Sequence, residues 1–115
     1  MSNKLYRGIR QGHVAKVFVD NEELSFEAAK VLRPSEATAE FGYFGEGPSQ
    51  TALAILYDAT GDGENSLKYY QFFKFDFIAN VDYFLGFTIL ESQIKEWLAN
   101  RIASENPPSG WGWGL

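Results

Sequence analysis

Apolar residues recur at helical spacing in three stretches of the second half of the chain. The first stretch begins at Pro48, which suits the first position of a helix because its missing N–H has no helical partner there. Gly61 suits the left-handed position just beyond the helix end. The spacing predicts one helix between them, with an apolar face of Ala52, Leu53, Leu56 and Ala59.

A second helix is predicted to begin after Asp62, a candidate N-cap, and a third to run from about Glu91 to Ile102. In the third, Glu91 and Lys95 form a supportive i,i+4 pair. The predicted apolar faces comprise Leu67, Tyr70, Phe73, Phe77, Ile78 and Val81 in the second helix, and Ile94, Trp97, Leu98 and Ile102 in the third.

The second helix carries two features that its apolar face does not explain. Lys74 falls inside that face, where a lysine either extends its ammonium to the rim or, if buried, has a lowered pKa and serves as a base or ligand contact. Tyr69, Phe72 and Phe75 point away from the face. Either the helix is packed on two sides, or these aromatic side chains are exposed and mark a protein interface.

The N-terminal third has the alternation of β-strands. Residues 4–10 and 13–20 are short runs rich in β-branched and aromatic residues, separated by a predicted turn at Gln11-Gly12. Both alternating sets of the second run are apolar, which predicts a strand covered on both faces. Residues 20–24 lead into a third short element, and residues 25–32 fit either a strand or one to two helical turns capped by Ser25. Residues 83–90 are β-prone, with a bend at Gly86.

Together these elements predict an α+β fold, in which a small, mainly antiparallel N-terminal sheet packs against about three helices. We expect a single domain over residues 1–104 and a distinct tail over 105–115, where Pro107-Pro108 stops any helix. The tail either folds back over apolar surface or is a recognition segment anchored by Trp111 and Trp113. Exchanged between two chains, it would form a dimer.

A glycine-rich stretch, residues 41–50, leads into the first predicted helix. Backbone N–H groups at a helix start favour an anion, but Glu46 lies within the stretch and no Lys or Arg neighbours it. The alternative is that the glycines turn Phe41, Tyr43 and Phe44 into the core, and we adopt this interpretation. Gln50 is a polar residue in the first turn that is expected to hydrogen-bond back to the loop.

Charge and composition exclude several classes of function. The net charge is -5, with six Lys and Arg against four Asp and Glu up to Pro34, and four against eleven in the rest. Such a surface repels phosphate backbones, so we expect no nucleic-acid partner. No apolar run spans a bilayer and the N-terminus lacks a signal-like apolar region, so we expect no membrane association and a cytoplasmic location.

The residues needed for common catalytic and metal sites are missing. The chain has no cysteine, and its one histidine, His13, stands alone at the start of a strand. The acids Asp58, Asp62 and Glu64 lack the alternating spacing of a calcium loop and fit the junction of two helices better. We therefore expect no metal and no cofactor, and we favour a protein that is not an enzyme.

Four segments resemble, in order, a family of small uncharacterised proteins of bacteria and phages. They are "YRG", "FGYFGEGPSQTALAIL", "YYQFFK" and "IKEWL", against a family pattern of Y-x-G, W-G-Y-x-G-S-G-P-A-Q-L-A-L-A-I-L, Y-x-x-F-K and I-x-x-W-L. The resemblance covers about residues 6 to 98. Phe41 replaces the usual Trp, Glu46 replaces Ser, and Ser49 and Thr51 replace Ala and Leu. The resemblance implies a shared fold and no catalytic residues.

Two functional hypotheses follow. The first is a non-enzymatic binding or protein-interaction module that uses Phe72, Phe75, Trp111 or Trp113 and could form a homodimer. The second is a small-molecule site or enzyme between the Gly45–Gln50 loop and the sheet. Its expected polar contacts are Tyr6, Arg7, Gln50 and Lys74.

Overall fold

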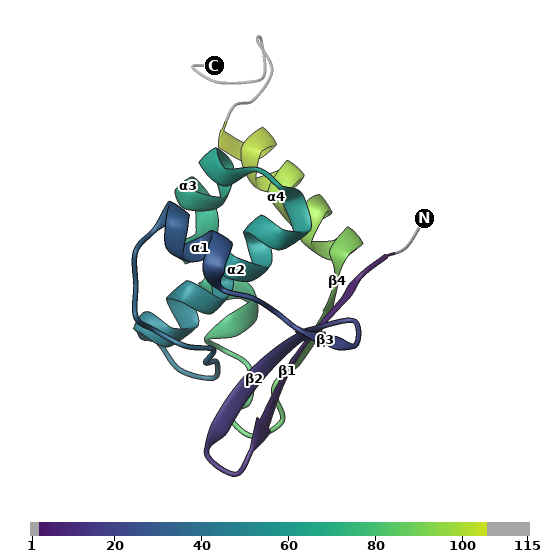
Figure 1. Ribbon diagram of the computed structural model, residues 1–115. Helices are drawn as coiled ribbons and strands as arrows, with labels where there is room; N and C mark the ends of the chain where they lie inside the picture. Colours follow the sequence, from purple (N-terminus) through teal and green to yellow (C-terminus); the bar gives the residue numbers. More distant parts are fainter. Residues whose placement is uncertain (1–2, 106–115) are drawn as a thin grey trace, which may run out of the picture.

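The computed structural model describes residues 3–105 and confirms the α+β fold (Figure 1). Three strands come first, followed by three helices, a π-helical segment, a fourth strand and a last helix. In order they are β1 (Leu5–Gln11), β2 (Val14–Val19), β3 (Glu22–Glu23), α1 (Glu27–Leu32), α2 (Glu46–Thr60), α3 (Gly63–Phe73), η1 (Lys74–Ile78), β4 (Phe87–Leu90) and α4 (Glu91–Glu105).

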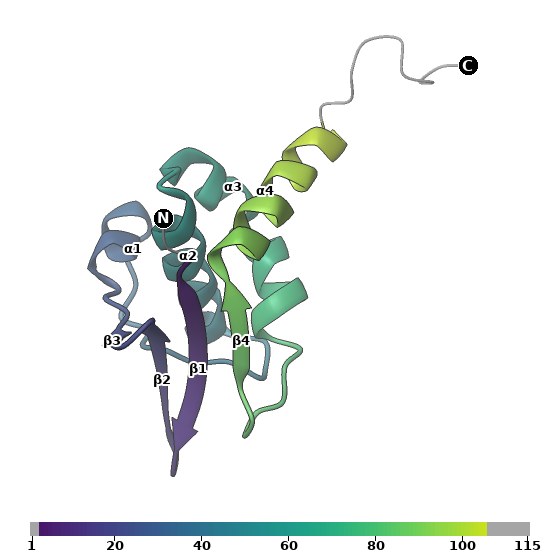
Figure 2. The same cartoon turned by 90° about the vertical axis from the view of Figure 1, so that its right-hand side faces the viewer.

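The four strands form one antiparallel sheet in the order β3-β2-β1-β4. The β-prone segment near residue 87 therefore supplies an edge strand that pairs with β1, although it lies some 80 residues away in the sequence, with Tyr6 opposite Ile89. All the helices lie on one side of the sheet (Figure 2). The second edge is β3, which is only two residues long.

The prediction that β2 is covered on both faces is wrong. Ala15 and Val17 are buried toward the helices, whereas Val14 on the opposite face is 57% exposed. The reason is that no second layer formed by residues 3–105 covers that face, and its apolar character comes from residues that are only partly buried. The turn also lies one residue later than predicted, at Gly12-His13.

Helix α2 runs through the centre of the molecule. All its residues from Pro48 to Leu56 are buried, because α1, α3, η1 and α4 surround the helix and the sheet packs beneath it (Figures 1 and 2). Gly8 of β1 permits this packing, since a Cβ there would lie 2.3 Å from the Phe87 ring. The aromatic ring occupies that space and meets Phe41 edge-on, with 5.4 Å between ring centroids.

Residues 25–32, which the sequence left open, form the short helix α1. Ser25 is not the cap that the sequence predicts, because Phe26 takes the N-cap position and has no side-chain cap. The Ser25 hydroxyl instead accepts a hydrogen bond from the N–H of Glu27, the first helical residue, at 3.2 Å. Only Ala29 of α1 is buried, and the helix lies beside α2.

The second predicted helix exists but ends earlier and less regularly than expected. Residues 63–73 are α-helical, and the chain then widens into a π-helical turn in which the Ala79 N–H donates to the Lys74 carbonyl at 2.8 Å. A π turn holds one more residue than an α turn, so it rotates the side chains that follow it. Leu67, expected in the core, is exposed, whereas Phe73 and Ile78 are buried.

Helix α4 follows β4 directly. Ile94 and Leu98 are buried as predicted, and Lys95 pairs with Glu91 at 3.4 Å. Trp111 and Trp113 lie outside the described residues, and the expected division between a domain and a tail near residue 104 stays a prediction. Within residues 3–105, none of the helices has both the length and the apolar character that a bilayer span needs.

Candidate functional site

Six large aromatic or aliphatic side chains are exposed close together beside the start of α2. Their exposed fractions range from 37% to 83%. They come from three separate segments: the loop before α2, the η1 turn and the loop before β4. We call this set, Tyr43, Phe44, Phe75, Tyr83, Phe84 and Leu85, the aromatic surface.

Ring contacts join the three segments into one surface. The Phe44 and Phe75 rings lie 5.8 Å apart between centroids, and those of Tyr43 and Tyr83 lie 6.3 Å apart. Tyr83 also meets the Phe84 ring edge-on at 5.0 Å. Since Tyr43 and Phe44 are neighbours in the chain, the contacts form a single cluster. Exposed apolar side chains that gather in this way are typical of protein-binding surfaces.

A hydrogen-bonded turn holds the most exposed part of the aromatic surface. One carboxylate oxygen of Asp82 accepts hydrogen bonds from the N–H groups of Phe84 and Leu85, at 2.8 and 2.9 Å, and the Asp82 carbonyl accepts one from Gly86 at 3.0 Å. The N–H groups of Leu85 and Phe84 hold the Asp82 pKa below its usual value. The backbone is thus fixed with two apolar side chains at its tip.

Arg10 anchors the same loop to the sheet. Its side chain is only 1% exposed, and its guanidinium lies 3.6 Å from the centre of the Tyr83 ring. It donates to the Tyr83 carbonyl at 2.8 Å, to the Phe41 carbonyl at 3.1 Å and to the Glu40 carboxylate at 3.0 Å. One arginine therefore ties β1 to both loops of the aromatic surface.

The expectation that Phe41, Tyr43 and Phe44 all turn into the core is correct only for Phe41. Phe41 is fully buried, whereas Tyr43 and Phe44 are exposed. Gly42 separates them with a φ of 84°, and a Cβ there would lie 2.6 Å from the Tyr83 Cα. The chain reverses at this glycine because the Tyr83 loop occupies the adjoining space, so the next two rings face outward.

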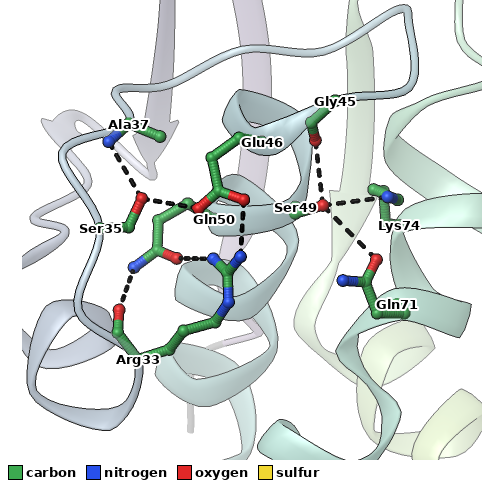
Figure 3. A network of polar contacts seen from close by, with 9 residues as sticks. All are labelled: Arg33, Ser35, Ala37, Gly45, Glu46, Ser49, Gln50, Gln71 and Lys74. Atoms are coloured by element: carbon green, nitrogen blue, oxygen red, sulfur yellow. Dashed lines mark hydrogen bonds and ion pairs between the residues drawn. The ribbon is translucent and has the colours of Figure 1, made fainter.

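A network of polar side chains lies on the other flank of the α2 start (Figure 3). Arg33, just after α1, donates to the Glu46 carboxylate and to the Gln50 side-chain oxygen, both at 2.6 Å. Gln50 returns a bond to the Arg33 carbonyl at 3.2 Å, and Ser35 donates to Glu46 at 2.7 Å. The hydrogen bonds from Arg33 and Ser35 lower the Glu46 pKa. Gln50 thus bonds to the end of α1 and not to its own loop.

Lys74 contacts the first turn of α2 from the opposite side (Figure 3). Its ammonium donates to the Ser49 hydroxyl at 2.9 Å, and that hydroxyl lies 3.0 Å from the Gly45 carbonyl and 3.4 Å from the Gln71 side-chain oxygen. A serine beside a lysine is an arrangement that hydrolases use. Here Ser49 is only 3% exposed, and its bond with Lys74 joins η1 to α2.

Tyr6 and Arg7 lie apart from both of these contacts. The buried Tyr6 hydroxyl donates a hydrogen bond to Asp58 of α2 at 2.7 Å. The Tyr6 pKa is raised mainly by burial and, to a smaller extent, by this bond to Asp58. The Arg7 guanidinium lies over the Phe18 ring, 5.6 Å from its centre, on the uncovered face of the sheet. The four polar residues predicted to line a small-molecule site therefore do not meet. A hollow of about 560 Å³ beside β3 is lined by other residues, among them Lys4, Asp20, Glu22 and Asp58.

The structure also separates the two predicted interface phenylalanines. Phe75, 58% exposed, belongs to the aromatic surface. Phe72 is exposed on the α4 side of α3, where the Arg101 guanidinium lies 3.9 Å from its ring centre. Within residues 3–105, no three side chains of the metal-binding types gather in one place.

Sequence reasoning identified only Phe75 of the six residues of the aromatic surface, since Tyr43 and Phe44 were expected in the core. Tyr83, Phe84 and Leu85 belong to an apolar run that we assigned to a strand, although that strand begins only at Phe87. A signal was present: Asp82 and Gly86 flank the three residues at the spacing of a tight turn.

Comparison with known proteins gives one finding. A model of a family of unknown function (DUF6166) matches residues 6–100. The chain belongs to this family. The resemblance noted in the sequence is thus confirmed at the level of a family whose function is not established. Neither the curated proteins nor the solved structures show a significant match to the chain.

Proposed function

We propose that the protein is a non-enzymatic protein-interaction module that binds a partner protein through the aromatic surface. The observation that carries the proposal is the cluster of six exposed side chains held on a fixed backbone. Aromatic side chains offer a large apolar contact area and lose little conformational entropy on binding, and they are enriched at interface centres.

The way in which the surface is held supports the same proposal. Arg10 and Asp82 fix the loop around Phe84 and Leu85 before any partner arrives. A surface that is already ordered loses little conformational entropy on binding.

Site-specific photo-crosslinking tests the proposal. A photoreactive phenylalanine analogue replaces Phe84, and the protein is irradiated in the cells from which it comes. The matched control carries the analogue at Val31, which is 84% exposed on α1, away from the aromatic surface. We expect a discrete crosslinked product from position 84 and not from position 31.

Two substitutions in the aromatic surface test whether the crosslink at position 84 depends on the rest of that surface. Phe44→Ser and Phe75→Ser, combined with the analogue at position 84, should abolish the product because both rings belong to the same surface. Equal crosslinking from positions 84 and 31, or a product that survives the two serine substitutions, would contradict the proposal.

A further inference from the structure

An open hollow of about 280 Å³ lies between η1 and α4. Four of its lining residues, Gln93, Glu96, Trp97 and Asn100, recur at helical spacing and so share one face of α4. The fifth lining residue is Phe77 of η1. We call this hollow the Trp97 pocket. It is separate from the aromatic surface, because none of the six residues of that surface lines it.

Two half-buried aromatic rings form a corner of the Trp97 pocket. The Trp97 and Phe77 rings lie 6.2 Å apart between centroids, and their planes are nearly perpendicular at 77°. The buried Phe73 ring contacts both, at 5.3 Å from Trp97 and 5.0 Å from Phe77. The Trp97 Nε1–H donates a hydrogen bond to the Asp76 carboxylate at 2.7 Å, which fixes the orientation of the indole. Both walls of the corner are therefore ordered before a ligand binds.

The charges at the Trp97 pocket are negative. The exposed Glu96 lines it, and the Asp76 carboxylate lies at the N–H edge of the indole. Within residues 3–105, no lysine or arginine is among the lining residues. The two cationic side chains of α4 are engaged elsewhere, since Lys95 pairs with a glutamate one turn earlier and Arg101 lies over a ring of α3. A cation in the pocket is thus attracted by both carboxylates.

We propose that the Trp97 pocket binds a trimethylammonium group, carried by a free amine or by a methylated lysine of another protein. Cations are attracted to the negative faces of aromatic rings, most strongly to that of tryptophan, and proteins recognise quaternary ammonium groups in this way. The carboxylate of Glu96 adds a charge of the opposite sign beside the rings.

The shape and size of the pocket favour this group over other cations. A trimethylammonium group is rounded and contacts two perpendicular rings at once, whereas a flat guanidinium stacks on a single ring face. It also donates no hydrogen bonds, and the Gln93 side-chain oxygen already accepts one from the Leu90 N–H at 2.8 Å. Pockets for drug-sized ligands measure about 300–1,000 Å³, so a smaller hollow suits a headgroup better than a whole cofactor.

NMR titration with choline tests the proposal. The matched probe is the uncharged tert-butyl analogue of choline, which has the same shape because carbon replaces the nitrogen. The Trp97 indole signal of the isotope-labelled protein, assigned with Trp97→Phe, is followed at constant ionic strength. We expect saturation by choline with a dissociation constant of about 1–20 mM, and at least about fivefold weaker binding of the analogue. The N-methyl protons of choline should show nuclear Overhauser contacts to the Trp97 and Phe77 rings.

Three variants assign the binding to this pocket. Glu96→Gln removes an exposed charge from the lining and should weaken choline binding about 2- to 5-fold. Glu22→Gln is the matched control, because it removes the same charge from β3 and should change nothing. Phe77→Leu keeps most of the side-chain volume but removes one ring, and it should weaken binding about 2- to 30-fold.

A peptide that carries trimethyllysine identifies the source of the group. Tighter binding of this peptide than of choline assigns the pocket to a methylated partner protein, and weaker binding assigns it to a free amine. Equal binding of choline and its uncharged analogue, unchanged affinity in both Glu96→Gln and Phe77→Leu, or N-methyl contacts to rings other than Trp97 and Phe77 would overturn the proposal. So would the absence of saturation at about 50 mM choline. The photo-crosslink at position 84 does not depend on any of these results.

Discussion

The side chains around the start of α2 differ in whether they have partners inside the fold. On one flank, Arg33 bonds to both Glu46 and Gln50, and on the other side of the helix Lys74 bonds to Ser49. In the aromatic surface, the Phe84 and Leu85 side chains are 74% and 83% exposed within residues 3–105. The residues that look chemically active are occupied inside the fold, and the apolar residues are available.

This difference shows where functional evidence lies in the molecule. A lysine and a serine 2.9 Å apart suggest catalysis until burial is considered. A single exposed phenylalanine does not indicate a function, but six exposed apolar side chains that lie close together indicate a binding surface. The polar groups therefore shape the helix start, and the aromatic surface is the better candidate for function.

The largest stability effect is expected at Arg10, which ties β1 to the two loops of the aromatic surface. Arg10→Met removes three hydrogen bonds to a buried guanidinium and should lower the free energy of unfolding by about 2–4 kcal/mol. Denaturant unfolding measures this loss. Arg7→Met is the control, because Arg7 lies over Phe18 on the uncovered face and its loss should cost less than about 1 kcal/mol. Equal effects at both positions would contradict the anchoring role of Arg10.

A smaller loss is expected from the polar network. Gln50→Leu keeps most of the buried volume but leaves the Arg33 carbonyl and guanidinium without their amide partner. We expect a loss of about 1–3 kcal/mol in unfolding free energy, with crosslinking from position 84 unchanged. Loss of the crosslink in a folded Gln50→Leu protein would move the functional site to this flank.

The contact between Ser49 and Lys74 is expected to be structural. Ser49→Ala and Lys74→Met should each cost about 1 kcal/mol, and a double-mutant cycle should show a coupling of about 0.5–1.5 kcal/mol. A fluorophosphonate probe, which labels reactive serines, should leave Ser49 unmodified. Labelling that Lys74→Met abolishes would instead reveal a catalytic pair.

The smallest effect concerns Glu46 and depends on pH. Its pKa is lower in the folded protein than its usual 4.5, so the ion pair with Arg33 stabilises the fold above that value and is lost as pH falls through the folded pKa. Glu46→Gln should remove this part of the acid sensitivity. Because Glu46 is half exposed, the difference at neutral pH should stay below about 1 kcal/mol. The measurement is acid unfolding of both proteins, and identical pH profiles would contradict the prediction.

Sequence patterns predicted the elements with strong local signals. Gly61 takes the left-handed position after α2, and Asp62 caps α3 by accepting from the Asn65 N–H at 3.0 Å. The predicted helix start at Pro48 is wrong by two residues, since α2 begins at Glu46. The glycine-rich stretch before α2 was predicted correctly only in part. Whether Tyr43 turns inward depends on the Tyr83 loop, which lies 40 residues away in the sequence and leaves no local trace.

The candidate site was predicted less well for the same reason. Phe75 was identified because a helical wheel places it off the apolar face, but Phe84 and Leu85 resemble a strand until Asp82 closes the turn. The sequence gives Arg10 the pattern of an ordinary strand residue. Only the folded structure shows that its side chain is buried. Periodicity in a sequence does not predict contacts between residues that are far apart in the chain.

The most direct test compares how two variants bind the crosslinked partner. Phe84→Ser with Leu85→Ser alters exposed side chains, whereas Ser49→Ala alters a buried one. We predict that the double variant unfolds within about 0.5 kcal/mol of the wild type yet binds the partner at least about tenfold more weakly. We predict the reverse for Ser49→Ala, with lower stability and unchanged affinity. Unchanged affinity in the double variant would contradict the account.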